Sequence, residues 1–484
     1  MRKNWILKPG CSAKTRVGIL LASARELVAL FLSNPRDFLL KAGLAAGRYR
    51  VGQHLLDKVS ADMYMPIDIV SDDFDRPILT VNPRLRKRTG APRVLYFVNS
   101  CLPYTSSGYT LRTQALLEAV GDKGLSILPI TRLGYPALVG KVAHGASTGV
   151  GAVEYYHLLP VAAPLRRENR EERVLELLAQ LVVRKDIDIL HTTTDFRNAA
   201  LVSQVARRTG RPWVYEVRGE RDQTFKADAL QRSKRIDASF LQKMRSKEND
   251  AMRAANKVIA LSDVSARSLV QRGIESTKIH VLPNGISSPA TKPRPLKIRQ
   301  MLGIDDHQVV VGAITSVVFY EGLDTLLEAL EFLPPSFIVL VVGTGAALPE
   351  LETLAKKLEL NDRVIFAGQQ SRETIADWYA ALDVFAMPRR NLEVCQRVTP
   401  IKSLQAMQLG IPVVASDLPA LREVTGGFAS YVEPECPEKL AQGIEDALHK
   451  RVDAEEKARQ RRFLEQRSWE AVADRLQGVY EDLT

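Results

Sequence analysis

Short apolar runs rich in β-branched residues alternate with stretches of helical periodicity from residue 93 to near the end of the chain. Such alternation predicts a parallel sheet covered by helices on both faces, because parallel strands need long crossover connections. The alternation occurs twice. The first series of expected strands is Val94–Asn99, Leu125–Pro129, Ile187–His191, Trp213–Val217, Lys257–Leu261 and Ile279–Leu282, and the second is Val309–Thr315, Phe337–Val342, Val364–Phe366, Val384–Met387, Val413–Ser416 and Ser430–Val432. We therefore predict an α/β chain with two doubly wound, Rossmann-like domains.

The two series are separated by the turn Pro283-Asn284-Gly285 and a run of further prolines, a composition typical of a linker. We place the first domain at residues 91–285, the second at 286–467, and at 468–484 a final helix that can cross back to the first domain. The length of 484 residues suits two hydrophobic cores rather than one. Two such sheets face each other across a cleft, and ligands bind at the carboxyl ends of their strands.

Residues 1–90 stand apart as a helical extension and linker with a basic run at Arg84–Arg88. A basic amphipathic helix can lie on a membrane surface; the other interpretation is a helical cap on the first domain. The segment Tyr135–Pro160 is rich in glycine and is expected to be an irregular insertion or a mobile loop.

The formal net charge of +11 favours anionic partners such as nucleotides, phosphates or acidic lipids. No nucleic-acid recognition motif accompanies this charge, so a nucleic-acid partner is not expected. The four cysteines form no CxxC pair, which suits a reducing cytoplasm. No run approaches the ~18 apolar residues that a membrane span needs. We expect a cytoplasmic protein that can contact the inner face of a membrane.

The segment after the expected strand 384–387 carries the main indication of a ligand site. Thr399 and Pro400 are residue types preferred at the N-cap and the first position of a helix. The free N–H groups at such a helix start attract a diphosphate. Lys402 in the first turn and Arg390 on the preceding loop would add positive charge.

Three glycines are candidates for close approach of a ligand to the backbone. Gly343 and Gly345 follow an expected strand, although the third glycine of the dinucleotide fingerprint is missing and NAD is therefore not predicted. Gly108 lies in the first domain, in NSCLPYTSSGYTLR, between a strand and a helix.

Charged residues end two strands of the first domain. His191 ends one strand, and Glu216 and Arg218 end another. Charges at these positions are costly in a core but natural at a cleft. Asp-x-Asp pairs occur at 186–188, where a strand begins, and at 73–75, in the N-terminal linker. Neither position suits a metal loop, so no metal site is predicted.

Several segments resemble the retaining GT-B glycosyltransferases of family 4, in the branch with YEGL and Pro-x-Lys. In the second domain they are EGLDTLLEAL (321–330), VVGTGAALPELETLA (341–355), RVIFAGQQSRETIADWYAALDVFAMP (363–388) and TPIKSLQAMQLGIPVVASDLPALREV (399–424). LPYTSSGYTLRT and VYEVRGE of the first domain are similar to the same family. The resemblance covers residues 93 to 482. It implies a UDP- or GDP-sugar donor in the second domain, an acceptor mainly in the first, no cofactor or metal, and net retention.

This resemblance assigns roles to the candidate residues. Lys402 and Arg390, with the helix start, would stabilise the departing diphosphate. The segment Val364–Gly368 would flank the base, and Gln405 would contact the ribose. The donor-binding set is Gly108, Ser316, Gly343, Gly345, Phe366, Gly368, Arg390, Thr399, Pro400 and Gln405. The catalytic set is His191, Glu216, Arg218 and Lys402, of which the first three would face the reacting sugar or the acceptor.

Four positions depart from the family pattern. Family members often carry an arginine and a lysine where this chain has Ser316 and Glu321, and two glutamates where it has Arg397 and Gln405. Lys402 could replace the missing cation.

The resulting hypothesis is transfer of a hexose or a related sugar to a glycan or lipid-linked acceptor, as in surface polysaccharide or glycoconjugate biosynthesis. Two alternatives stay open. A nucleotide-sugar 2-epimerase of the same fold would be expected to place several histidines and carboxylates in the cleft, and the chain has only seven histidines. A non-catalytic GT-B scaffold subunit is the second alternative, and Ser316, Glu321 and Gln405 motivate it.

Overall fold

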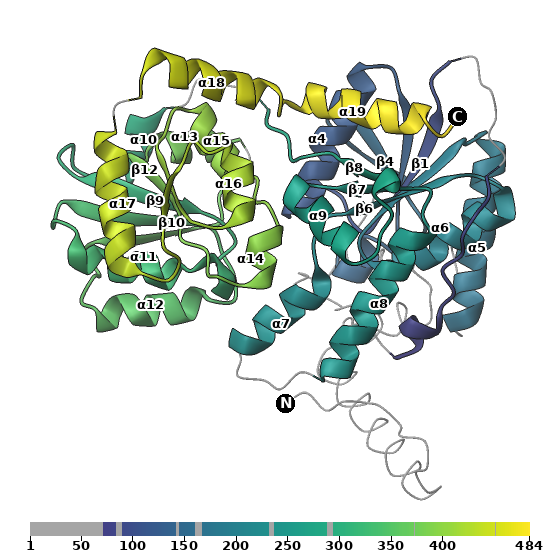
Figure 1. Cartoon of the computed structure of the whole chain (residues 1–484), viewed down its shortest axis with the longest axis horizontal. Coiled ribbons are helices and arrows are strands. Elements are labelled where there is room, and N and C mark those ends of the chain that lie inside the picture. Colours follow the sequence, from purple (N-terminus) through teal and green to yellow (C-terminus); the bar gives the residue numbers. More distant parts are fainter. Residues whose placement is uncertain are drawn as a thin grey trace, which may run out of the picture.

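The computed structural model describes residues 71–83, 90–141, 145–159, 167–231, 237–287, 294–371, 373–450 and 452–484. The helical extension, the basic run and the membrane contact expected within residues 1–90 lie outside this part of the chain. The described residues form two α/β bodies that lie side by side and are connected by two C-terminal helices (Figure 1).

The first body is built on an eight-stranded sheet with the order β3-β4-β2-β1-β5-β6-β7-β8. Its strands are β1 (Arg93–Val98), β2 (Ser126–Thr131), β3 (Ser147–Val150), β4 (Val153–His157), β5 (Ile189–Thr193), β6 (Trp213–Val217), β7 (Lys257–Ala260) and β8 (Ile279–Val281). Its helices are α4 (Gly108–Asp122), α5 (Arg167–Arg184), α6 (Phe196–Thr209), α7 (Arg221–Gln231), α8 (Ala238–Ala254) and α9 (Asp263–Gln271). The pairing is parallel except between β3 and β4.

The hairpin β3–β4 corrects the expectation of an irregular segment at Tyr135–Pro160. In β4 the side chains alternate between buried and exposed, with Val153, Tyr155 and His157 turned inward. This period of two is the ordinary signal of a half-buried strand, and the surrounding glycines hid it. The hairpin extends the sheet beyond β2, and β4 pairs in parallel with β2.

The second body has a six-stranded parallel sheet with the order β11-β10-β9-β12-β13-β14. Its strands are β9 (Val309–Ile314), β10 (Phe337–Val342), β11 (Val364–Gly368), β12 (Val384–Met387), β13 (Val413–Ser416) and β14 (Ser430–Val432). Its helices include α11 (Leu323–Ala329), α12 (Leu348–Lys357), α13 (Ile375–Ala380), α15 (Lys402–Gln408), α16 (Pro419–Thr425) and α17 (Pro437–His449). The sheet follows the doubly wound pattern that the alternation predicts.

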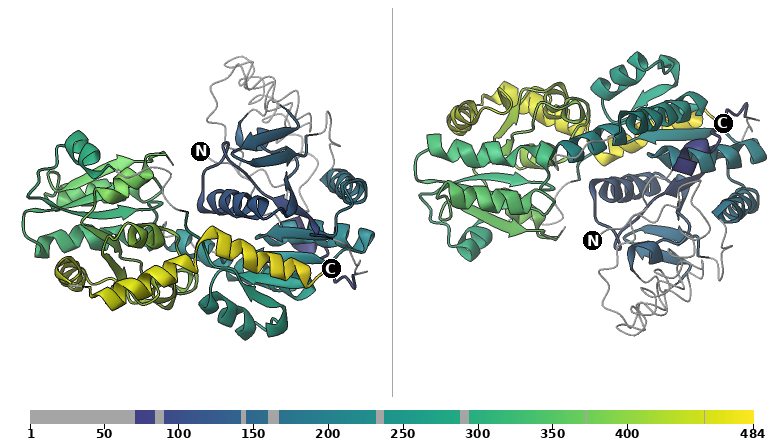
Figure 2. Two further views of the ribbon diagram at one scale, coloured as in Figure 1. Left: turned by 90° about the horizontal axis from the view of Figure 1, so that it is seen from above. Right: turned by 90° about the horizontal axis from the view of Figure 1, so that it is seen from below.

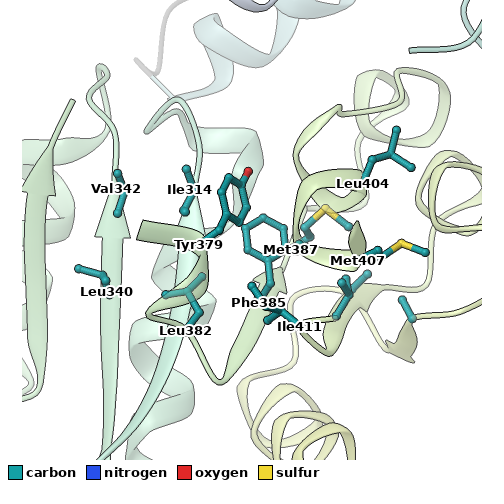
Figure 3. Close-up of a cluster of buried hydrophobic side chains, with 14 of the residues drawn as sticks. Ile314, Leu340, Val342, Tyr379, Leu382, Phe385, Met387, Leu404, Met407 and Ile411 are labelled. Carbon is teal, nitrogen blue, oxygen red and sulfur yellow. The ribbon is translucent and has the colours of Figure 1, made fainter. Parts of the chain in front are cut away.

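Both faces of the second sheet carry apolar cores. On one face, Tyr379, Phe385, Met387 and Leu404 pack together (Figure 3). The hydroxyl of Tyr379 donates to the carbonyl of Lys402 at 3.2 Å, so this core also fixes the start of α15. On the other face, the buried side chains of β9 and β10 pack on those of α11, α12 and α17.

The chain crosses between the two bodies twice, and the two crossings are hydrogen-bonded to each other. Ile286, in the linker, donates its N–H to the carbonyl of Arg467 at 2.8 Å, and Trp469 donates to the carbonyl of Ile286 at 3.3 Å. The return crossing runs from α18 (Ala454–Glu465) to α19 (Trp469–Glu481). Helix α19 lies along the first body, as Figure 2 shows from two further sides.

From residue 93 on, the sequence predicts helices at 110–120, 171–183, 198–208, 240–255, 264–272, 323–330, 348–358, 372–380, 399–409, 420–423, 438–449 and 469–480. Among the described residues, four helices have no counterpart in this prediction. They are α7, α10 (Pro295–Leu302), α14 (Glu393–Arg397) and α18. Helix α14 has only five residues, and α18 has no buried residue, so neither carries the apolar stripe that marks a helix in a sequence.

Shortening a buried side chain of α19 tests the packing of this helix on the first body. Leu476 is fully buried in a cluster with Val94, Leu116 and Ile189. We expect Leu476→Ala to lower the free energy of unfolding of the first body by about 2–5 kcal/mol, because it removes buried methyl groups and leaves a cavity. Denaturant titration measures this change.

The exposed neighbour Arg475 provides the matched control. Arg475→Ala should change the free energy of unfolding by less than about 0.5 kcal/mol. Equal effects of the two substitutions would contradict the packing described for α19.

Candidate active site

The strand order of the second sheet places its switch point between β9 and β12, where the connections leave toward opposite faces. The residues that follow these strands form a charged cluster. Lys402 donates from Nζ to Oγ1 of Thr315 at 2.7 Å. The guanidinium of Arg389 holds the carboxylate of Glu321 at 2.6 and 3.2 Å. Thr315, Glu321 and Lys402 line one pocket together with Pro388 and Pro400.

Burial and neighbouring charges set the ionisation of this cluster. Burial lowers the pKa of Lys402 to about 8; the carboxylate of Glu321 opposes this shift, and Arg389 adds to it. Burial alone would raise the pKa of Glu321, but Arg389 and Lys402 outweigh it and the pKa lies below its usual value. At neutral pH the cluster therefore has two cations and one carboxylate.

The start of the helix after β12 differs from the prediction. Helix α15 begins at Lys402, its N-cap is Ile401, and no side chain caps it, so Thr399 is not the N-cap and Pro400 is not the first helical residue. Thr399 is buried, and its Oγ1 has no hydrogen-bond partner among the described residues. Its carbonyl accepts from Nδ2 of Asn284 in the linker at 3.2 Å.

Gly343 and Gly345 lie so close to neighbouring backbone atoms that neither position has room for a side chain. A Cβ at Gly343 would fall on the carbonyl oxygen of Thr315, and a Cβ at Gly345 would fall on that of Val317. The Gly-x-Gly turn thus lets the β10 loop lie against the β9 loop. Gly343 also has a φ of 142°, which side chains rarely adopt.

The structure corrects the placement of Arg390. Its guanidinium contacts Asp324, bonds to Glu435 at 2.8 Å and to the carbonyl of Phe319 at 3.2 Å, and stacks over the ring of Phe319. These contacts anchor Arg390 to the second body. The arginine beside Lys402 is instead its neighbour Arg389.

The remaining donor-binding candidates stand on several elements. Ser316 is exposed on the loop after β9. Phe366 and Gly368 lie on the edge strand β11, and Phe366 packs partly on the core. Gln405 is half-buried on α15. Gly108 opens α4, next to the N-cap Ser107, and a Cβ there would meet nothing within 4 Å. None of these positions contradicts the predicted contact with a donor.

In the first domain, the carboxylate of Glu216 is the centre of a buried hydrogen-bond network. Arg112 donates to Oε1 from Nε at 2.9 Å, Arg218 donates to Oε2 from Nε at 2.9 Å, and Tyr96 donates to Oε2 at 2.6 Å. Glu216 is fully buried and Arg218 is 6% exposed. Burial alone would raise the pKa of Glu216, but the two guanidinium groups hold it far below its usual range.

His191 also lies inside this network rather than at the cleft surface. Its Nδ1 shares a hydrogen bond with the hydroxyl of Tyr480 at 2.6 Å, and its ring stacks on Tyr96. Burial lowers the pKa of His191 to about 3, so the ring is neutral. The expectation that His191 and Glu216 face a substrate is therefore corrected, because both side chains are fully buried beneath the cleft. Arg218 bonds to Glu216 but also lines the pocket between the two domains, so its predicted contact with a substrate stays a prediction.

The network reaches the interdomain linker. Arg112 donates from Nη2 to the carbonyl of Leu282 at 3.0 Å, and from Nη1 to the carbonyl of Pro283 at 2.9 Å and to Oδ1 of Asn284 at 3.1 Å. Because Asn284 also bonds to Thr399, a chain of hydrogen bonds joins the first domain to the loop before Lys402.

The two domains meet through charged groups. Arg397 donates from Nη1 to Oε2 of Glu220 at 3.1 Å. The carboxylate of Glu423 accepts the N–H groups of Asp263 and Val264 at 2.6 and 2.7 Å, at the start of α9. A carboxylate at this end of a helix is favourable because the helix dipole is positive there.

Sequence reasoning missed Thr315, Glu220 and Arg112. Thr315 and Glu220 had a positional signal, since each lies just beyond the end of a strand. Arg112 had no such positional signal, because it lies within a helix, and the sequence does not distinguish a buried helical arginine from an exposed one.

In the part of the chain that the structure describes, no group of three or more histidine, cysteine, aspartate or glutamate side chains could hold a metal ion. Within the same residues, no helix is long and apolar enough to cross a membrane.

Solved structures share this two-domain arrangement. Sucrose-phosphate synthase from Thermosynechococcus elongatus superposes with a TM-score of 0.64 at 19% identity, over 81% of this chain and 99% of that one. HepE from Anabaena, solved in complex with UDP, has a TM-score of 0.58 at 20% identity, over 81% of this chain and 100% of that one. At these identities the likeness shows the fold.

Relatives of known name align with parts of the chain. A D-inositol 3-phosphate glycosyltransferase from Xylanimonas cellulosilytica is 28% identical over 256 residues, which are 49% of this chain and 59% of that protein. The lipopolysaccharide core biosynthesis mannosyltransferase LpsB from Rhizobium meliloti is 34% identical over 158 residues, 30% of this chain and 43% of that protein. The chain thus spans about half the length of these relatives.

Two family models divide the chain between them. A glycosyl transferase 4-like domain matches residues 107–285, and the domain of glycosyl transferases group 1 matches residues 296–475. The two matches correspond to the two bodies of the structure. The chain belongs to family 4 of the GT-B glycosyltransferases.

Replacing Glu216 tests how much the first domain depends on the buried network. Glu216→Gln would leave the guanidinium groups of Arg112 and Arg218 buried without their shared negative charge. We expect the free energy of unfolding at pH 7 to fall by about 3–5 kcal/mol. Because the pKa of folded Glu216 is depressed, the difference from wild type should shrink as the pH falls below about 4, where the carboxylate of the unfolded chain is protonated.

The control is Glu172→Gln. Glu172 is exposed and pairs with Arg208 at 2.9 Å on the surface. Its substitution should leave the free energy of unfolding nearly unchanged, because solvent screens an exposed ion pair. A comparably small effect of Glu216→Gln would show that the buried network does not stabilise the domain.

Proposed function

We propose that this chain is a metal-independent glycosyltransferase. It moves a sugar from a nucleotide-diphosphate sugar to a glycan or lipid-linked acceptor, with retention at the anomeric carbon. The observation that carries the proposal is the contact between Nζ of Lys402 and Oγ1 of Thr315 at the switch point of the second sheet. A cation and a hydroxyl at this edge are suited to a diphosphate, because both donate hydrogen bonds to phosphate oxygens.

The charge balance of the cluster supports Lys402 as the diphosphate ligand. Arg389 forms a two-point ion pair with Glu321, so these two charges compensate each other. The side chain of Lys402 bonds to a neutral hydroxyl, and its charge is the surplus one. Lys402 therefore supplies the cation in a chain that carries Ser316 and Glu321 at the positions of the family's arginine and lysine.

In the proposed reaction, the bond between the anomeric carbon and the diphosphate oxygen breaks, and the acceptor oxygen bonds to the same carbon. Negative charge grows on the diphosphate as it leaves. The ammonium of Lys402 and the hydroxyl of Thr315 would stabilise this charge, and such preorganised donors are usually the largest contribution to catalysis. The proton of the acceptor hydroxyl leaves with the departing diphosphate or passes to solvent.

The other assignments follow from this placement. Phe366 and Gly368 would flank the base, Gln405 would contact the ribose, and the first domain would hold the acceptor. A UDP-sugar is favoured because HepE has been solved in complex with UDP-glucose. The names of the relatives refer to inositol phosphate and to the lipopolysaccharide core. They favour an acceptor that is itself a glycoconjugate precursor, glycosylated at the inner face of a membrane.

Replacing Lys402 tests this function. Lys402→Met removes the ammonium and keeps much of the side-chain volume. We expect the affinity for UDP or GDP at pH 7 to fall about 10- to 100-fold, since a charged hydrogen bond to the diphosphate is lost. We expect sugar transfer to fall further, by about 10²- to 10³-fold. Isothermal titration calorimetry and a transfer assay with radiolabelled donor measure the two effects.

Lys356→Met is the matched control, because Lys356 is an exposed lysine on α12. It should change neither quantity by more than twofold. Turnover of Lys402→Met within a few-fold of wild type would contradict the proposal. Absence of any nucleotide affinity in the wild-type protein would favour the scaffold subunit, and turnover of UDP-N-acetylglucosamine without an acceptor would favour the epimerase.

The pH dependence of nucleotide binding provides a second test. The pKa of Lys402 lies at about 8, so its ammonium is lost as the pH rises through this value. Because only the ammonium attracts the diphosphate, the affinity for the nucleoside diphosphate should fall about tenfold between pH 7.5 and 9.5. The affinity of Lys402→Met should stay nearly constant over the same range. A flat profile in the wild-type protein would contradict the role of Lys402.

A further inference from the structure

Asn284, in the linker, is buried between the two domains and bonds to a group of each. It is only 4% exposed. Its Oδ1 accepts from Nη1 of Arg112, on helix α4 of the first domain, at 3.1 Å. Its Nδ2 donates to the carbonyl of Thr399, in the second domain, at 3.2 Å. The side-chain amide of one residue thus bridges the two domains.

The chemistry of the two partners explains why this residue is an asparagine. The guanidinium of Arg112 has only donors, and the carbonyl of Thr399 has only acceptor sites, so the bridge needs one acceptor and one donor side by side. A side-chain amide provides both. A carboxylate would accept from Arg112 but would bring a second acceptor against the carbonyl of Thr399.

The first domain fixes the position of Asn284. Arg112 also donates to the carbonyl of the preceding residue, Pro283, at 2.9 Å. On the other side, a Cβ added to Gly285 would fall on the ring of Trp469, which belongs to the buried cluster that α19 forms with the first domain. The linker is therefore held against the first domain directly before and directly after Asn284.

The segment that Asn284 contacts leads directly to Lys402. Residues 398–401 connect α14 to α15, which begins at Lys402. Because residue 400 is a proline, the peptide unit between Thr399 and Pro400 has no N–H group, and its carbonyl is the group that a hydrogen bond can hold. A shift of this carbonyl would displace the start of α15, and with it the ammonium that contacts Thr315.

The carbonyls on either side of this peptide unit are held from within the second domain. The carbonyl of Val398 accepts from Nη1 of Arg389 at 3.0 Å, and that of Lys402 accepts from the hydroxyl of Tyr379 at 3.2 Å. The carbonyl of Thr399 differs, since its donor is in the linker. The path of the chain into α15 is thus set by both domains.

We propose that Asn284 is a positioning residue for Lys402. By holding the carbonyl of Thr399 from a linker that is fixed to the first domain, it places the ammonium of Lys402 where the donor diphosphate binds. The inference rests on the function proposed above and adds that the diphosphate cation depends on the position of the first domain. Asn284 does not line the pocket of Lys402, so its effect on nucleotide binding passes through that residue.

Replacing Asn284 by alanine tests this inference, because it removes the bridge without adding a charge. We expect the affinity of Asn284→Ala for UDP or GDP at pH 7 to fall about three- to tenfold, as for the loss of a hydrogen bond. Turnover should fall further, by about 10- to 100-fold, because a small misplacement is costly in the transition state. Equilibrium dialysis with radiolabelled nucleotide and the transfer assay measure the two effects in the full chain.

Asn256→Ala is the matched control. Asn256 forms the same kind of bridge at the opposite edge of the first sheet: its Oδ1 accepts from the N–H of Trp213 at 3.0 Å, and its Nδ2 donates to the carbonyl of Val81 at 3.2 Å. The control should lower the temperature of unfolding about as much as Asn284→Ala does. It should change nucleotide affinity and turnover by less than about twofold.

Combining the substitution with Lys402→Met separates positioning from a general structural effect. If Asn284 acts through Lys402, Asn284→Ala should change nucleotide affinity by less than about twofold in the Lys402→Met background, because residues that act as one unit are not additive. Should Asn284→Ala fail to fold, Asn284→Asp keeps the bond from Arg112 and loses the one to Thr399. Its positioning effect would disappear in the Lys402→Met background, whereas repulsion of the diphosphate by the new carboxylate would persist there.

The outcomes distinguish the proposed function from this inference. A wild-type protein that binds no nucleotide, or a Lys402→Met variant that binds it as well as wild type, would overturn both. If Lys402→Met weakens binding but Asn284→Ala behaves like Asn256→Ala, only this inference is overturned. Equal losses caused by Asn284→Ala in the wild-type and Lys402→Met backgrounds would also overturn it, because Asn284 would then act independently of Lys402.

Discussion

The carboxylate of Glu216 is the interaction on which the arrangement of this protein depends. It compensates two guanidinium groups that have almost no access to solvent, those of Arg112 and Arg218. Arg112 uses its remaining N–H groups on the linker, whose Asn284 bonds to the loop before Lys402. Breaking a buried ion pair leaves an uncompensated charge, which is strongly destabilising. Through Arg112, the carboxylate of Glu216 thus connects the buried network of the first domain to the linker that leads into the second domain.

The fold could be predicted from the sequence because its signal is repeated and periodic. Every strand of the second sheet coincides with an expected apolar run, and the sheet order confirms the doubly wound pattern. The elements that the sequence analysis missed are those whose apolar periodicity is short or is obscured by neighbouring residues. The strand Val153–His157 is surrounded by glycines, and α18 has no buried residue to set a period. The helix predicted from Thr399 begins at Lys402 because residue preferences suggest a cap but do not fix where the backbone turns.

The candidate site could be predicted only in part, because a sequence gives position along a strand and not the direction of a side chain. Lys402 was expected in the first turn of a helix after β12, and its side chain lies beside Thr315 at the end of β9. His191 and Glu216 follow the rule that charged groups gather at strand ends, but their side chains turn into the core. Choosing between the adjacent arginines Arg389 and Arg390 requires knowing which one contacts Glu321. That contact is made between elements far apart in the sequence.

The central claim is that the cation for the donor diphosphate is Lys402, beside Thr315 at the edge between β9 and β12. A crystal structure of the full chain with its bound nucleoside diphosphate tests this claim most directly. The account predicts diphosphate oxygens within hydrogen-bond distance of both Nζ of Lys402 and Oγ1 of Thr315, with the base near Phe366. A diphosphate held instead by Arg390, or a nucleotide bound away from this edge of the sheet, would contradict it.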